Sequence, residues 1–325
     1  MFRTDRRGIF AGLVALYAIA LAGAAHAQVP QIRLGYGPAA EEQLWLLIAK
    51  PDVGKHYGKA YTLEATRFTG SDKRAQAFEA GALDLASSSA NGALFAAAEG
   101  VRMKIIASLS KESAKAFSTT YYALADSPIR TVKDLKGKTI GINGFSTSGH
   151  LWVKVALEKN GLTEKDVTLV PVRFPAMGEA LRGGKIDVGM FPQPFAAMAE
   201  KDMKVRKIFT AKDAAPFDEE LIVMTAKEEF LKKNAAAVKA FLEDLALATR
   251  FYIAKPREAR QILIDTKMVR ATPDVYLDMH DYYHDADLRV DAEALEKMQD
   301  LQLRAGFQKK RADVKVMVDN SYLPK

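Results

Sequence analysis

The chain has 325 residues, of which 49% are hydrophobic and 27% are charged. This composition is typical of globular proteins and excludes disordered and fibrous classes, and the length predicts two domains or one large α/β domain. The absence of cysteine excludes a disulfide scaffold, a thiolate metal site, a cysteine nucleophile and a lipid anchor on an N-terminal cysteine. The net charge of +7 raises the question of a nucleic-acid partner.

The first 27 residues have the pattern of a secretory signal peptide. Arg3, Arg6 and Arg7 precede an apolar run over residues 9–22, and residues 25–27 form an A-x-A cleavage pattern. We therefore expect cleavage after Ala27 and localisation in the periplasm, by the Sec or the twin-arginine route, with an uncleaved anchor as the alternative. Cleavage removes three arginines and one aspartate, which lowers the net charge from +7 to +5. That modest charge, without a basic run interleaved with aromatic residues, predicts no nucleic-acid partner.

Strands and helices are expected to alternate along the rest of the chain. Residues 31–35 and 61–68 alternate apolar and polar side chains as strands do, and a turn at 69–72 precedes a helix predicted over 73–80. The other predicted strands are 83–86, 103–108, 119–125, 139–143, 167–173, 186–190, 205–209 and 221–225, and the other predicted helices are 39–50, 92–99, 131–135, 150–160, 177–182, 235–254, 256–266, 272–283 and 291–305. This alternation predicts parallel sheets with right-handed crossovers.

A repeated string divides the chain into two similar units. Arg67-Phe68 and Arg173-Phe174 each precede a turn, a predicted helix and the pattern G-x-[LI]-D-[LV]-[AG], which stands at residues 81–86 and 184–189. We infer two lobes of the same βα construction. In open α/β sheets, ligands bind beyond the carboxyl ends of the strands. The loops expected to line a cleft between the lobes are therefore 36–38, 69–71, 87–91, 144–148, 174–176 and 191–194.

These features resemble a known family. Residues 131–142, TVKDLKGKTIGI, are similar to the L-K-G-K signature of periplasmic solute-binding proteins. The repeated strings, Phe191-Pro192 and the helical tail resemble the branch that serves nitrate, sulfonate and taurine ABC transporters (NMT1/THI5-like). The resemblance implies an α/β, two-lobed type II periplasmic binding protein fold, in which each lobe is a mostly parallel sheet flanked by helices and two hinge strands cross between them. It implies lobe 1 at 28–122 and 221–325 and lobe 2 at 123–220.

The function implied by the resemblance is solute capture. Members of this family close on a small solute by a hinge motion and deliver it to an ABC permease and ATPase at the inner membrane. A monomeric binding protein is therefore expected, not an enzyme, with no cofactor and no metal. The alternatives are an enzyme on the same fold, of the kind that forms pyrimidine precursors, and a binding subunit that feeds a membrane sensor. The sequence has neither a Walker phosphate loop nor a G-x-S-x-G nucleophile elbow.

The candidate ligand-binding loops carry hydroxyl groups at the expected starts of helices. Unpaired backbone N–H groups and the helix dipole favour an anion at such a place. Two further loops follow the first strand and the Phe191-Pro192 turn. Together these loops predict ligand binding by Tyr36, Gly37, Pro38, Ser88, Ser89, Ala90, Phe145, Ser146, Thr147, Ser148, Phe191 and Gln193.

The expected ligand is a small organic anion, either sulfonate-like or a carboxylate, with an apolar or aromatic body. Relatives often have Trp-Asp-Pro where this chain has residues 191–193, and the missing carboxylate disfavours a ligand with an ammonium group. Tyr36, Phe68, Phe145 and Phe191 are instead candidates for an apolar wall.

Several other polar residues admit both a functional and a structural interpretation. Arg67 and Arg173 end strands near the cleft, where they could grip a carboxylate or act as a structural pair. His150 follows the Ser/Thr loop and is a candidate ligand contact. His280 and His284 stand one helical turn apart beside carboxylates, which is a metal-like spacing, although a solvated helix face is the favoured interpretation.

Overall fold

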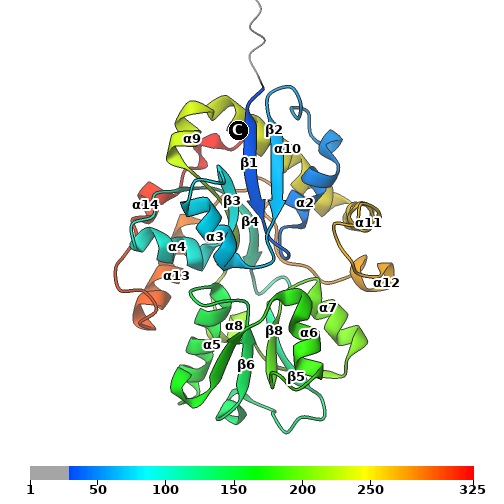
Figure 1. The fold of residues 1–325 in the computed structure, drawn as a ribbon, viewed down its shortest axis with the longest axis vertical. Helices are drawn as coiled ribbons and strands as arrows, with labels where there is room; N and C mark the ends of the chain where they lie inside the picture. Colours follow the sequence, from blue (N-terminus) through cyan, green and yellow to red (C-terminus); the bar gives the residue numbers. More distant parts are fainter. Residues whose placement is uncertain (1–28) are drawn as a thin grey trace, which may run out of the picture.

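The computed structural model describes residues 29–325, and the expected signal peptide with its cleavage site after Ala27 lies outside these residues. The described chain forms two lobes, each built on a five-stranded sheet flanked by helices (Figure 1). This is the two-lobed α/β architecture that the sequence predicts. Within residues 29–325, none of the helices combines the length and apolar character needed to span a bilayer.

The first lobe is the upper one in Figure 1, and its sheet has the order β2-β1-β3-β10-β4. Its strands are β1 (Gln31–Tyr36), β2 (Thr62–Arg67), β3 (Leu85–Ser89), β4 (Lys104–Glu112) and β10 (Glu219–Ala226). β10 is antiparallel to both of its neighbours, whereas the other four strands run in one direction. The sheet is therefore mixed, with a single reversed strand.

The second lobe repeats this arrangement. Its sheet has the order β7-β6-β8-β5-β9, and β5 is antiparallel to its two neighbours. The strands are β5 (Thr120–Leu124), β6 (Thr139–Ile142), β7 (Thr168–Pro171), β8 (Val188–Phe191) and β9 (Val205–Thr210). The chain crosses between the lobes from β4 to β5 and from β9 to β10. The lobe boundaries expected at 122/123 and 220/221 fall within β5 and β10 and stay predictions.

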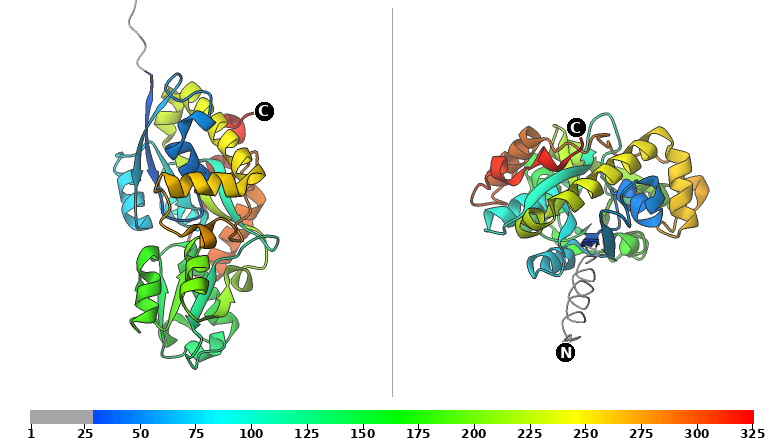
Figure 2. Two further views of the ribbon diagram at one scale, coloured as in Figure 1. Left: turned by 90° about the vertical axis from the view of Figure 1, so that its right-hand side faces the viewer. Right: turned by 90° about the horizontal axis from the view of Figure 1, so that it is seen from above.

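Helices cover both faces of the first sheet (Figure 2). One apolar core packs α2 (Glu42–Ala49), α10 (Ala235–Ala254) and α11 (Pro256–Asp265) on one face. A second core involves α3 (Ser71–Glu79), α4 (Ala90–Ala98), α13 (Ala292–Arg304) and α14 (Val314–Met317). The second lobe has a core of its own, with α5 (Ser148–Lys159), α6 (Phe174–Arg182), α7 (Phe195–Asp202) and α8 (Ala211–Ala214). The short helices α9 (Glu228–Lys233) and α12 (Pro273–Tyr276) complete the first lobe.

The repeated string has the same structural role in both lobes. The carboxylate of Asp84 accepts a hydrogen bond from the backbone N–H of Arg33 at 2.9 Å, and that of Asp187 accepts one from Thr139 at 2.8 Å. In the first lobe, a Cβ at Gly35 would lie 2.5 Å from Leu83 Cδ1. In the second lobe, a Cβ at Gly141 on β6 would lie 2.7 Å from Ile186 Cδ1, and Ile186 occupies the place of Leu83 in the repeated string. The internal repeat inferred from the sequence is thus a repeat of packing as well.

The serine run of the first lobe is strand rather than loop, contrary to the sequence prediction. Residues 87–89 form the end of β3, where they pair with residues 222–224 of β10, and α4 begins at Ala90. β-Structure forms here because β10 supplies partners for the backbone, which a local sequence pattern does not reveal.

The helix predicted over 272–283 is also wrong beyond α12. After Tyr276 the chain runs along β4 in an irregular path, and the backbone N–H groups of Ser108 and Lys111 donate to the carbonyls of Leu288 and Tyr283. Backbone pairing with a neighbouring strand replaces the pairing within a helix. The remaining predicted elements are present, with ends that differ by a few residues.

Candidate ligand-binding cleft

The carboxyl ends of parallel strands from both lobes meet at one small cavity, which we call the central cleft cavity. Gly37 follows β1, Ser89 ends β3, Asn143 follows β6 and Pro192 follows β8, and all four residues line it. Its volume is about 50 Å³. The other lining residues are Pro38, Ala39, Ala40, Glu41, Ser71, Arg74, Thr119, Ser148, Gly149, Phe174, Met190, Leu221, Ile222 and Tyr282. Both lobes contribute, as expected for a ligand site at the strand ends.

Helix N-termini from both lobes surround this cavity, and three of them carry hydroxyl groups. α3 begins at Ser71, α4 at Ala90 and α5 at Ser148. The Ser89 hydroxyl caps α4 by accepting from Gly92 N–H at 3.1 Å, and the Thr147 hydroxyl caps α5 by accepting from His150 N–H at 3.4 Å. The remaining N–H groups of the first turns carry partial positive charge, which favours an anion between them.

A second cavity of about 230 Å³, the outer cleft cavity, adjoins the first. It shares Ser71, Arg74 and Ser89 with the central cleft cavity and reaches Phe145, Ser146 and Thr147 of the second lobe. The two cavities therefore form a continuous lining around Arg74.

Arg74, on α3, places a buried positive charge in the cleft. The side chain is 5% exposed, and its Nη1 atom has no hydrogen-bond partner among residues 29–325. Burial lowers the pKa of Arg74, while the attraction of Glu41 opposes the shift. A buried guanidinium nitrogen without a partner is costly unless something else supplies the acceptor. An anionic ligand would supply it, and the sequence prediction did not include this residue.

Glu41 places a carboxylate in the same cavity. One of its oxygens accepts a hydrogen bond from Gly37 N–H, and the other has no partner within the described chain. Burial raises the pKa of Glu41, and the nearby Arg74 works against that rise. A Cβ at Gly37 would collide with the charged ends of both Arg74 and Glu41, so the absence of a side chain at Gly37 lets the two charges lie close together in this arrangement. The inference that the cleft lacks a carboxylate is therefore wrong.

The predicted ligand-binding residues divide into three groups. Gly37, Pro38, Ser89 and Ser148 line the central cleft cavity, and Ser88, Ser89, Phe145, Ser146 and Thr147 line the outer one. Tyr36, Ala90, Phe191 and Gln193 line neither cavity. Gln193 instead donates to the carbonyl of His280 at 2.7 Å, and Phe191 packs edge-on against Tyr122 in the core of the second lobe. Ligand contact by any of these residues stays a prediction.

The apolar side of the cleft is made by residues other than those predicted. Tyr36 and Phe191 are buried outside the two cleft cavities, and Phe145 is 55% exposed at the rim, so they form no common wall with Phe68. Phe174, Met190, Leu221, Ile222 and Tyr282 line the central cleft cavity in their place. They come from both lobes and from the irregular segment after α12, which local patterns could not bring together.

The remaining candidates have other partners. His150 bonds through Nε2 to Glu164 at 2.6 Å. Arg67 donates to the carbonyl of Met268 at 2.9 Å and lines a separate cavity of about 500 Å³ at the side of the cleft, the lateral cavity. Arg173 reaches across the cleft to the Thr69 hydroxyl at 3.4 Å. These contacts favour structural roles for His150 and Arg173.

Comparison with solved structures shows the same fold in proteins of low sequence identity. The alkanesulfonate-binding protein SsuA from Xanthomonas axonopodis pv. citri, bound to MOPS, superposes with a TM-score of 0.74 at 19% identity, covering 90% of this chain and 99% of that one. The periplasmic aliphatic sulphonate-binding protein SsuA from Escherichia coli gives 0.70 at 20% identity, with coverages of 89% and 92%. The periplasmic nitrate-binding protein NrtA from Synechocystis PCC 6803 gives 0.69 at 12% identity, with coverages of 91% and 87%.

Sequence comparison gives the family. No curated protein sequence matches the chain. The sequence model of the family described as NMT1/THI5 like matches residues 63–259, which is well over half of the chain and runs through parts of both lobes. The chain therefore belongs to the NMT1/THI5-like family, as its sequence motifs and its repeated lobe construction predicted.

Proposed function

We propose that this protein is the periplasmic substrate-binding component of an ABC importer and that it captures a small organic anion between its lobes. The observation that carries the proposal is the buried Nη1 of Arg74, which lacks a hydrogen-bond partner among residues 29–325 and lies among the helix N-termini of the cleft. An anionic head group would accept from Arg74 and from free N–H groups at once. The sulfonate and nitrate binding named for the structural relatives supports this ligand class.

The rest of the ligand would lie against the apolar side of the central cleft cavity. Phe174 and Met190 belong to the second lobe and Ile222 to the first, so a ligand that contacts all three favours the closed arrangement of the lobes. Glu41 also admits a zwitterion such as taurine as the ligand, because one of its carboxylate oxygens has no hydrogen-bond partner within the described chain and could accept from an ammonium group. A simple binding role, without catalysis, accounts for these features.

A thermal-shift panel tests the ligand class. The purified protein is heated with alkanesulfonates, taurine, carboxylates, nitrate and neutral sugars, and a cognate anion is expected to raise Tm because it binds only the folded state. At a ligand concentration a hundred times Kd, the stabilisation is about 2.7 kcal/mol. Stabilisation by neutral sugars alone contradicts the proposal.

Substitution of Arg74 tests the site. Arg74→Gln is expected to weaken binding of the cognate anion at least tenfold, because it removes the guanidinium that would donate to the head group. It also takes away the charge that faces the buried Glu41, so the Tm of the free protein is expected to fall and binding is measured below that temperature. Arg67→Gln is the matched control, since Arg67 lines the lateral cavity. Loss of binding in Arg67→Gln but not in Arg74→Gln would place the ligand in the lateral cavity instead.

Membership of an importer needs a separate test. Deletion of the gene is expected to abolish uptake of the cognate anion by intact cells, and the Arg74→Gln protein should fail to restore it. Normal uptake in the deletion strain, together with loss of a signalling response to the anion, would favour a sensor partner.

A further inference from the structure

A cluster of buried ionisable groups lies beside the cleft and is not explained by ligand capture. Glu42 belongs to α2, and Asp281 and His284 belong to the irregular segment after α12. One ligand atom from each of these three side chains lies within 4.8 Å of the other two. The cluster adjoins the central cleft cavity, because the neighbouring residues Glu41 and Tyr282 line that cavity.

His284 presents a free ring nitrogen to the cluster. Its Nδ1 lies 2.8 Å from the carbonyl oxygen of Leu109, which can only accept, so Nδ1 carries the proton. Its Nε2 is buried and has no hydrogen-bond partner in the described chain, although it lies 3.7 Å from Asp281 Oδ2, within ion-pair distance if the ring is protonated. An imidazole whose N–H is held by a backbone carbonyl is oriented as metal-binding histidines are.

Glu42 is the least explained group of the cluster. It is fully buried, and neither carboxylate oxygen has a hydrogen-bond partner among residues 29–325. An isolated buried carboxylate costs several kcal/mol, on the order of the net stability of many domains. A cation or a proton therefore has to compensate it.

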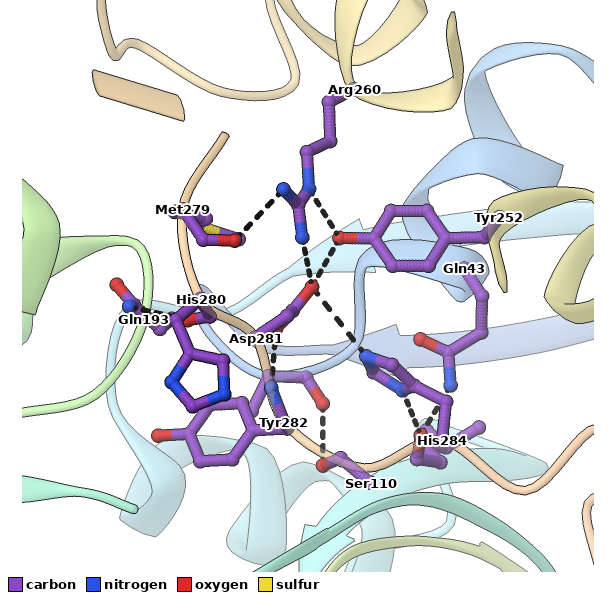
Figure 3. A network of polar contacts seen from close by, with 12 residues as sticks. Gln43, Ser110, Gln193, Tyr252, Arg260, Met279, His280, Asp281, Tyr282 and His284 are labelled. Atoms are coloured by element: carbon purple, nitrogen blue, oxygen red, sulfur yellow. Dashed lines mark hydrogen bonds and ion pairs between the residues drawn. The ribbon is translucent and has the colours of Figure 1, made fainter. Parts of the chain in front are cut away.

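Asp281 is held in place by its neighbours. Its Oδ2 accepts from the Tyr252 hydroxyl at 2.5 Å and from Arg260 Nη2 at 2.8 Å, and its Oδ1 accepts from the backbone N–H of Tyr282 at 2.7 Å. Figure 3 shows Asp281 between Arg260, Tyr252 and His284, with the ring of His280 lying apart from this group. Arg260 balances only one of the two carboxylates, so when His284 is neutral the second carboxylate, Glu42, needs a cation or a proton of its own.

We propose that Glu42, Asp281 and His284 form a binding site for one divalent transition-metal cation, with Zn²⁺ as the best match. Two carboxylate oxygens and one imidazole nitrogen suit zinc, whereas calcium and magnesium prefer oxygen alone. An ion placed centrally between the three ligand atoms, which lie within 4.8 Å of one another, would be at most about 2.8 Å from each of them. Zinc–nitrogen and zinc–oxygen distances are about 2.0–2.2 Å, so each side chain has to move toward the ion by less than about 1 Å. Water completes the coordination.

The site would join two parts of the first lobe that are distant in sequence. α2 carries Glu42, whereas Asp281 and His284 lie more than 230 residues later in the chain. Asp281 is 12% exposed at its side chain, so the cluster is not sealed completely from solvent. A metal here stabilises the wall of the cleft that carries Glu41 and Tyr282, and it does so whether or not the organic ligand is an anion.

Titration of chelator-treated protein with ZnCl₂, in the absence of any organic ligand, tests the site. Calorimetry and native mass spectrometry are expected to show one Zn²⁺ per chain and a Tm that rises with the metal concentration. Glu42→Gln and His284→Gln should each weaken Zn²⁺ binding at least tenfold. His280→Gln is the matched control and should bind as the unsubstituted protein does, because its ring is not part of the cluster.

Three results would overturn the proposal: no saturable Zn²⁺ binding, binding that survives both Glu42→Gln and His284→Gln, or binding lost equally in His280→Gln. If a substituted protein does not fold, the absorption spectrum of the unsubstituted protein loaded with Co²⁺ decides instead. A four-coordinate site with oxygen and one imidazole ligand is expected, and six-coordinate, aquo-like Co²⁺ contradicts it. Failure here would leave the anion-binding function unaffected, because Arg74 is not part of the cluster.

Discussion

Asp84 and Asp187 link two neighbouring parallel strands in the same way in both lobes. Asp84 stands directly before β3 and Asp187 directly before β8. The carboxylate of Asp84 accepts from the backbone N–H of Arg33 on β1, and that of Asp187 accepts from Thr139 N–H on β6. Each aspartate also donates its own backbone N–H to that strand. Asp84 additionally pairs with the Arg33 side chain, so Asp187 is the cleaner of the two to test.

Asp187→Ala is expected to lower the free energy of unfolding by about 1–3 kcal/mol, because it leaves the Thr139 N–H without its acceptor. Asp187→Asn, which keeps an acceptor oxygen, should lose less. Urea denaturation with an unchanged m-value measures both. The exposed Asp202→Ala is the control and should change stability by less than about 0.5 kcal/mol. Equal effects of Asp187→Ala and Asp202→Ala would contradict this role.

The residues that the sequence did not single out are those buried by distant parts of the chain. Arg74 lies in the strongly charged stretch SDKRAQAFE, where nothing separates one buried arginine from a solvated helix face. The sequence pattern predicts a polar, solvated first turn of a helix for Glu41, Glu42 and Gln43. They are buried by distant parts of the chain: α10 and α11, some 200 residues later, pack over α2, and Glu41 faces the cleft beside Arg74. Local patterns therefore predict the strand ends but not the charges between them.

At the scale of elements, predictions succeeded where the side-chain pattern is local and failed where a distant strand decides the structure. The α10 helix and the strands that carry the repeated string follow directly from apolar periodicity and from the glycines that end the preceding helices. The serine run and the segment after α12 instead take their structure from β10 and β4. The Ser/Thr loop expected at 144–148 is confirmed except for Ser148, which begins α5. It was predictable because β6 and Gly144 come before it and a helix capped by Thr147 follows.

Glu219, the first residue of β10, is expected to make the free energy of unfolding depend on pH. Burial raises the pKa of Glu219 to about 8, and Glu112 on β4 adds to the shift while Lys212 on α8 opposes it. The folded protein therefore binds this proton more tightly than the unfolded chain does, whose glutamate titrates near 4.3. The stabilisation is complete below the unfolded pKa and is lost as the pH rises through about 8.

The free energy of unfolding is accordingly expected to fall between pH 5 and about pH 9, and Glu219→Gln should flatten this fall. A remaining slope is expected because burial also raises the pKa of Glu112. Chemical denaturation at a series of pH values measures it. The exposed Glu229→Gln serves as the control and should keep the original slope. A Glu219→Gln protein with an unchanged pH profile would show that Glu219 is not the group responsible.

For the whole molecule, the two lobes touch directly across the cleft. The amide of Asn91, at the start of α4, donates to the Ser148 hydroxyl at the start of α5 at 3.0 Å, and Gln302 of α13 donates to the Asn91 oxygen at 2.7 Å. The chain thus has a buried polar contact that exists only when the lobes are together. Ligand capture by closure is linked to such contacts, because each one shifts the balance between open and closed forms.

Asn91→Ala should therefore weaken ligand binding although Asn91 lines neither cleft cavity. Loss of one buried hydrogen bond of about 1 kcal/mol corresponds to about a fivefold rise in Kd. Small-angle scattering should show that the cognate ligand reduces the radius of gyration of the unsubstituted protein, and that Asn91→Ala needs more ligand to reach the same compact state. Asn234→Ala, which removes an amide contact within the first lobe, is the control and should leave Kd unchanged. A ligand that binds both proteins equally, or that leaves the radius of gyration constant, would mean that capture does not proceed by closing the lobes.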